Sequence, residues 1–119
     1  MTTQEIAEKL ISYCREGKWE EAQKELYADD VVSIEAEASP VYDKITKGLP
    51  AIIEKGNTFN SMVDEFHSLV VSEPLVAGAA FSMTMTMDVK LKGQDREVMS
   101  ELCVYEVKDG KVISEQFYP

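Results

Sequence analysis

The feature that most constrains the fold is a run of strict alternation in the second half of the chain. From Ala77 to Leu91 every second residue is apolar, and the residues between are small, polar or charged. Because successive side chains of a strand point to opposite faces of a sheet, this period of two predicts one long strand with a packed face and a polar face. Turn signals at Lys92–Asp95 and at Asp109-Gly110 divide the rest into strands over Arg96–Val107 and Val112–Tyr118.

The first half of the chain shows helical spacing instead. Gly17 is a natural stop for the first apolar stripe, and Pro50 suits the first turn of a later helix. Three helices and one early strand followed by an antiparallel meander indicate the α+β class, with the helices packed on one side of a curved sheet. The elements expected in this half are helices over Thr3–Gly17, over Lys18–Tyr27 and from Gly48 onward, and strands over Val31–Glu37 and Asp64–Val71.

The charge balance excludes several classes of partner. Twelve Lys and Arg against 22 Asp and Glu leave a formal net charge of −10, whereas nucleic acids and anionic membranes require basic clusters. No apolar stretch approaches the length of a membrane span, and no secretory signal is visible. Cys14 and Cys103 are too few for a disulfide scaffold. We therefore expect one cytoplasmic domain over residues 1–119 that binds neither nucleic acid nor membrane.

Four motifs together resemble the NTF2-like superfamily, in particular its SnoaL-like branch. They are Gly17-Lys18-Trp19, the run from Leu26 to Val32, the run from Lys47 to Ile53, and the ending from Val104 to Val112. The resemblance implies a cone, in which the sheet curls, the helices shut the mouth and ligands bind inside. The same scaffold hosts isomerases, polyketide cyclases, dehydratases, transport factors and proteins with no known activity, so the resemblance implies a fold rather than one reaction.

The resemblance also implies one candidate base. The steroid-isomerase branch of the superfamily carries its general base at the position of Glu35. Its helical tyrosine is replaced here by Leu10, with Tyr13 one turn later, and its protonated carboxylic acid is replaced by Cys103. Both donors to the enolate oxygen are therefore absent, which argues against a ketosteroid isomerase mechanism. The His/Asp pair of the SnoaL-like cyclases has no matching positions either.

Pleat counting adds two candidate acids. If Cys103 faces the cone, alternation turns Glu101 inward, and the resemblance turns Glu115 inward on the last strand. With Glu35 they would share an apolar cavity, where like charges cannot all ionise cheaply, so one would stay protonated and serve as an acid. The alternative is that bulges turn Glu101 and Glu115 to the rim or the solvent. The expected ligand-binding residues are Tyr13, Phe81, Met83, Met85, Met99, Cys103, Tyr105 and Phe117.

His67 is the only histidine and lies on a predicted strand. It is a candidate proton shuttle for these glutamates, and the alternative is a partly exposed position on the outer face. No ligand-spacing motif accompanies it, so we expect no metal and no cofactor.

The polar face of the long strand, with Ser82, Thr84 and Thr86, is unusually free of charge for so acidic a chain. It indicates a contact between two sheets, and the family that the chain resembles commonly dimerises there, so we expect a homodimer. The leading hypothesis is a pocket for a small hydrophobic molecule, with isomerase, cyclase or dehydratase chemistry. A non-catalytic binding module and an accessory subunit of mixed dimers are the alternatives.

Overall fold

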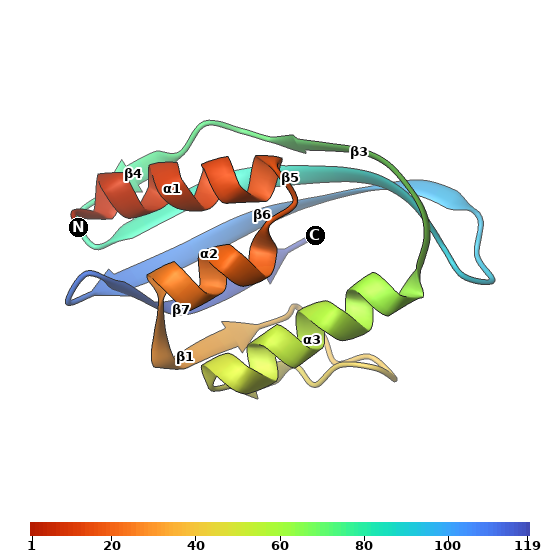
Figure 1. Cartoon of the computed structure of the whole chain (residues 1–119), viewed down its shortest axis with the longest axis horizontal. Helices are drawn as coiled ribbons and strands as arrows, with labels where there is room; N and C mark the ends of the chain where they lie inside the picture. Colours follow the sequence, from red (N-terminus) through yellow and green to blue (C-terminus); the bar gives the residue numbers. More distant parts are fainter.

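The computed structural model describes residues 1–119 and places three helices on one side of a curved, unclosed sheet (Figure 1). The seven strands follow the order β2-β1-β7-β6-β5-β3, and β4 pairs with β5. All neighbouring pairs are antiparallel except β1 and β7. The elements are α1 (Thr3–Arg15), α2 (Trp19–Leu26), β1 (Tyr27–Ile34), β2 (Ile45–Lys47), α3 (Leu49–Met62), β3 (Val63–Val71), β4 (Leu75–Ala77), β5 (Ala80–Leu91), β6 (Arg96–Lys108) and β7 (Lys111–Tyr118). The α+β class and the helix count are confirmed.

The limits of the α1–α2 hairpin are determined by residues at the helix ends. Thr2 and Glu5 form a reciprocal capping box at the start of α1, which satisfies backbone donors that the first turn leaves free. Gly17 lies between α1 and α2 with a φ of +73°, a conformation that favours glycine. The inner stripe of α1 is buried against the sheet, and with 13 and 14 residues α1 and α3 are the longest helices. No helix is both long and apolar enough to cross a bilayer.

The long strands carry the alternation predicted for them. Phe81, Met83 and Met85 are buried and Thr84 is exposed, and the ring of Phe81 stacks on Tyr105 of β6 at 4.8 Å between centroids. Strands β5 and β6 pair without a register shift from Ala80–Glu106 to Lys90–Arg96. Their hairpin extends beyond the helices (Figure 1). The inner face of this pair is therefore continuous from the core out to its open end.

Two expected boundaries are corrected. The strand expected over Val31–Glu37 is β1, which begins directly after α2, because residues 27 and 32–34 pair with β7 around a bulge. The strand expected from Ala77 is divided, because Gly78, with a φ of +57°, turns the chain so that Ala77 pairs with Ala80. Tertiary pairing and one glycine conformation decide these limits, and neither is visible in a periodic pattern.

Candidate functional site

The most deeply buried carboxylate of the sheet is Glu115 on β7, at 4% exposure. It accepts hydrogen bonds from the Tyr27 hydroxyl and from Ser33 Oγ, the latter at 2.6 Å. Ser33 lies directly opposite Glu115 in the parallel β1–β7 pairing, so strand register brings these two together. Burial raises the pKa of Glu115, while the two hydrogen bonds act in the opposite direction.

A lysine continues this set of contacts from the helical layer. Lys55 on α3 donates from Nζ to Ser33 Oγ and to Glu35 Oε1, both at 2.8 Å. Its ammonium also lies 5.5 Å from the centre of the Phe117 ring. The side chain of Lys55 is 14% exposed and that of Glu35 is 26% exposed. Tyr27, Glu115, Ser33, Lys55 and Glu35 thus form one connected polar chain that runs from the core toward the solvent.

Glu101 is the third carboxylate of this region, on β6 opposite Met85. Burial, followed by the charges of Glu35 and Glu115, raises its pKa to about 7. The thiol of Cys103 lies 3.9 Å from Glu101 Oε1. A carboxyl group with this pKa exchanges protons near neutral pH, which is the property that a general acid or base requires.

The register decides where the sequence-predicted carboxylates face. The bulge between β6 and β7 falls at Glu106 and Val107, and Tyr105 pairs directly with Glu115. Glu101, Glu115 and Tyr105 therefore share the inner face, and Glu35 reaches it through Lys55. Of the predicted lining, Phe81, Met83, Met85, Cys103 and Tyr105 are buried on this face, and Phe117 lies beneath Lys55.

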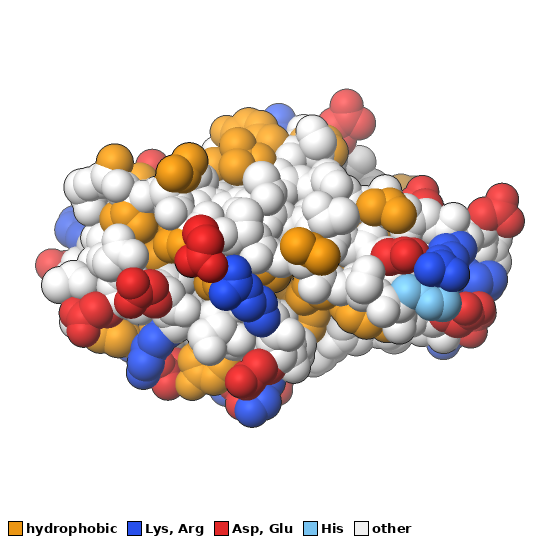
Figure 2. Space-filling model, turned by 90° about the horizontal axis from the view of Figure 1, so that it is seen from above, with side chains coloured by type: hydrophobic (Ala, Val, Ile, Leu, Met, Phe, Trp, Pro, Cys, Tyr) orange, Lys and Arg blue, Asp and Glu red, His pale blue; other side chains and the backbone are white.

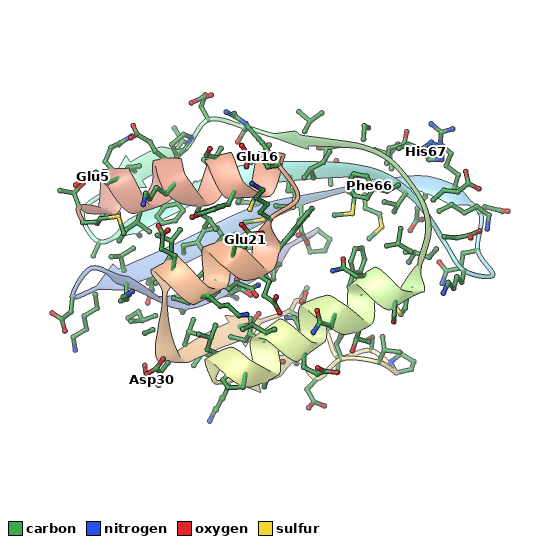
Figure 3. All side chains as sticks on the ribbon, viewed as in Figure 1. Glu5, Glu16, Glu21, Asp30, Phe66 and His67 are labelled. Carbon is green, nitrogen blue, oxygen red and sulfur yellow. The ribbon has the colours of Figure 1, made fainter.

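Three predicted residues lie outside this group. Met99 is 37% exposed near the open end of β6. Tyr13 donates instead to Glu25, at 2.7 Å, on the side of the helical hairpin. His67 contacts Glu65 at 3.0 Å, beside a bulge in β3 between residues 66 and 68. Figures 2 and 3 show His67 at the extended end of the sheet, among charged side chains and away from the helices.

Sequence reasoning did not identify Lys55, Ser33 or Tyr27 as members of the site. Lys55 follows the buried Ile52 by three residues and precedes the half-buried Phe59 by four, so it stands on the inward side of α3. A lysine at core spacing is a signal that could have been found. No group of three or more His, Cys, Asp or Glu side chains is arranged to hold a metal ion.

A groove of about 530 Å³, within the size range of ligand sites, opens between the helical hairpin, the end of α3 and β3. Its lining residues are Arg15, Glu16, Gly17, Trp19, Phe59, Asn60, Val63, Phe66 and Leu69. None of the three carboxylates lines the groove, but Phe59 stands one turn of α3 from Lys55. On the sheet, Leu69 of β3 pairs with Met87 of β5, two residues from Met85, which pairs with Glu101 of β6. The groove therefore shares α3 with the polar chain, although no residue of the polar chain lines it.

Comparisons with known proteins agree with this architecture. The family model of the SnoaL-like domain matches residues 1–119. A candidate SnoaL-like polyketide cyclase from Mesorhizobium loti, also described as a carbohydrate phosphatase, is 32% identical, with a TM-score of 0.92 and 100% of both chains covered. No curated protein matches the sequence significantly.

More distant structures share the fold alone. A protein of unknown function with a cystatin-like fold from Xanthomonas campestris is 13% identical, with a TM-score of 0.84 over 99% of this chain and 90% of that one. A Catenulispora acidiphila protein with a ketosteroid isomerase-like fold, in complex with trimethylamine, is 15% identical, with a TM-score of 0.75 over 99% of this chain and 87% of that one.

Proposed function

Because the chain belongs to the family of SnoaL-like domains, we propose that it binds a small, mainly hydrophobic carbonyl compound and performs cofactor-independent acid–base chemistry on it. Isomerisation, ring closure and dehydration all need a base to remove a proton and an acid to return one. The observation that carries the proposal is the pair Glu35 and Glu101. One is ion-paired with Lys55, whereas burial and neighbouring charges raise the pKa of the other to about 7.

The two carboxylates suit different roles. Glu35 Oε1 accepts a hydrogen bond from Lys55, whereas Glu35 Oε2 has no donor within the protein. Oε2 is therefore the candidate to take a proton from carbon. Glu101, with a pKa raised to about 7, keeps its proton below neutral pH and is the candidate acid. Glu115 has both oxygens engaged by Tyr27 and Ser33. We therefore assign Glu115 a positioning role instead of a direct one.

The groove supports the ligand class. Trp19, Phe59 and Phe66 contribute aromatic surface, and Val63 and Leu69 contribute aliphatic surface. A flat hydrophobic molecule seated there would direct its polar end along α3 toward Lys55 and Glu35. Trp19 is the only tryptophan, so its fluorescence reports occupancy of the groove.

Hydrogen–deuterium exchange of a simple ketone tests the chemistry. We expect the wild-type protein to accelerate exchange of the α-protons of 2-tetralone with D₂O, followed by NMR. Glu35→Gln should slow this exchange roughly 100-fold or more, the usual contribution of a general base. Glu65→Gln, which alters an exposed glutamate paired with His67, is the matched control and should exchange like the wild type.

Other outcomes separate the competing functions. Unchanged exchange in Glu35→Gln would remove Glu35 as the base. Quenching of Trp19 by 2-tetralone without any acceleration of exchange would favour the non-catalytic binding module. If 2-tetralone causes no quenching of Trp19 and its α-protons do not exchange faster, the result would count against a pocket for hydrophobic carbonyl compounds.

We extend the proposal to the assembly and the compartment. Val70, Val98, Leu102 and Tyr118 are exposed apolar residues, and the register places Leu102 between Thr84 and Tyr118. A second copy of the chain would cover this outer face, which is uncharged around Ser82, Thr84 and Thr86, in a homodimer. Leu102→Glu should then give a monomer in sedimentation, whereas a wild-type monomer would contradict the proposal. The cysteines are free and buried, which suits the cytoplasm.

A further inference from the structure

Lys55 is held by three groups that fix the direction of its ammonium. Ser33 Oγ and Glu35 Oε1 each accept one N–H at 2.8 Å, and the Phe117 ring lies on another side. A lysine ammonium carries three N–H donors. Ser33 and Glu35 are the only hydrogen-bond acceptors that contact Nζ, so one donor is left for a molecule from outside the chain.

The buried polar groups around Lys55 are costly to desolvate, which calls for a functional reason. Glu115 is buried at 4% exposure, and its two oxygens serve Tyr27 and Ser33. Burying carboxyl and ammonium groups is expensive, and well-packed apolar residues are often at least as stable. The only member of the polar chain that carries a donor with no acceptor is Lys55. The buried end of the chain therefore serves to orient this lysine.

We propose that Lys55 is the hydrogen-bond donor to the carbonyl oxygen of the ligand and stabilises the negative charge that develops there. This inference rests on the proposed function and adds the group that stabilises the negative charge on the ligand oxygen, which the proposed function did not assign. When Glu35 Oε2 takes a proton from the carbon next to the carbonyl, the C–H electron pair forms the enolate double bond. The carbonyl π electrons then move to the oxygen, which faces the Lys55 ammonium. The proton later returns to carbon, so no electron donor or acceptor is needed.

The position of Lys55 makes this role effective. A preorganised donor in a site with little water stabilises developing charge far more than the same donor in bulk water. Lys55 contacts Glu35, so base and donor flank the same space. They fit a ligand in which one carbon separates the oxygen from the carbon that bears the acidic C–H, as in a ketone with an α-C–H. The same donor would bind a phenolate, whose oxygen carries the charge permanently.

Binding of 4-nitrophenol tests the inference without relying on turnover. Its visible absorbance reports how much is phenolate, and quenching of Trp19 reports total binding. We expect the wild-type protein to bind the phenolate in preference to nitrobenzene, which lacks the phenol oxygen. Lys55→Met should weaken phenolate binding roughly 10- to 100-fold, as for loss of a hydrogen bond to a charged group. Nitrobenzene binding should change little.

Controls separate this role from a structural one. Lys55→Arg keeps the charge and should restore part of the preference for the phenolate. Lys90→Met removes a surface lysine paired with Asp64 and should bind both probes like the wild type. If Lys55→Met alone does not fold, the double variant Glu35→Gln/Lys55→Met, which leaves no unpaired charge in this pair, is compared with Glu35→Gln.

The outcomes also separate this inference from the proposed function. Equal phenolate affinity in Lys55→Met and the wild type would overturn the inference and leave the pocket intact. Absence of both probes from the wild-type groove would overturn the pocket and the inference together. Borohydride trapping of 2-tetralone as a covalent adduct on Lys55 would show that the lysine attacks the carbonyl, which also overturns the donor role.

Discussion

The polar chain and the extended end of the sheet contain the same kinds of charged groups in opposite settings. At the extended end, Asp64 bridges Lys90 at 2.8 Å and Asp88 bridges Arg96 at 2.9 Å. These pairs do not share partners, and their side chains are 21–56% exposed. Ion pairs open to solvent contribute about 0–1 kcal/mol each. In the polar chain, by contrast, each side chain is hydrogen-bonded to the next, from Tyr27 to Glu35. The difference shows that connection and burial, more than charge count, mark the region where chemistry is expected.

Removal of the buried carboxylate should have the largest effect on stability. Glu115→Ala leaves the Tyr27 hydroxyl without its acceptor, frees Ser33 Oγ and opens a cavity, at a cost of about 3–5 kcal/mol in the free energy of unfolding. Urea denaturation at pH 5 measures it. Glu115→Gln keeps an acceptor oxygen, so its free energy of unfolding should fall clearly less than that of Glu115→Ala. Equal stability of Glu115→Ala and the wild type would mean that the polar chain does not hold this part of the core.

The pH dependence of stability should show the second largest effect. Glu101 titrates near 4.5 in the unfolded chain and near 7 in the folded protein. Between these values the folded state retains a proton that the unfolded state releases, so stability falls as pH rises from about 4.5 to about 7. At about 1.4 kcal/mol per pKa unit this loss amounts to roughly 3 kcal/mol.

Glu101→Gln isolates that contribution. The free energy of unfolding of the variant should equal that of the wild type or be slightly lower at pH 5. At pH 8 it should be higher, because the amide has no charge to desolvate. Urea denaturation at both pH values measures the difference. Glu97→Gln alters an exposed residue four positions earlier on the same strand and should follow the wild type. If Glu101→Gln keeps the full pH dependence, the source lies elsewhere, with Glu115 the next carboxyl to examine.

The smallest effect should come from the extended end of the sheet. Lys90→Met breaks the bridge to Asp64 and should change the free energy of unfolding by no more than about 1 kcal/mol. Thermal denaturation at low and high salt checks it, because screening weakens exposed pairs. A loss of several kcal/mol would show that this end is coupled to the core and would erase the contrast with the polar chain.

Much of the site was predictable from the strands and little of it from the helices. Pleat counting from Cys103 placed Glu101 on the inner face, the resemblance placed Glu115 there, and the unshifted register between β5 and β6 keeps Glu101 there. The bulges in β3 are not encoded in a two-residue period, and the strand next to His67 changes register because of them. The spacing of Lys55 from Ile52 and Phe59 indicates the inward side of α3, but its partners Ser33 and Glu35 depend on how α3 packs on β1, which is a tertiary relation.

The parallel pairing of β1 and β7 also determines when the site can form. Ser33 and Glu115 are 82 residues apart in the chain, and β7 lies between β1 and β6 in the sheet. During synthesis the helices and β1 emerge before β7, the central strand that joins them to the rest of the sheet. Such long-range closure slows folding. The nascent chain therefore holds Lys55 and Glu35 without the strand that orients them until β7 has been made.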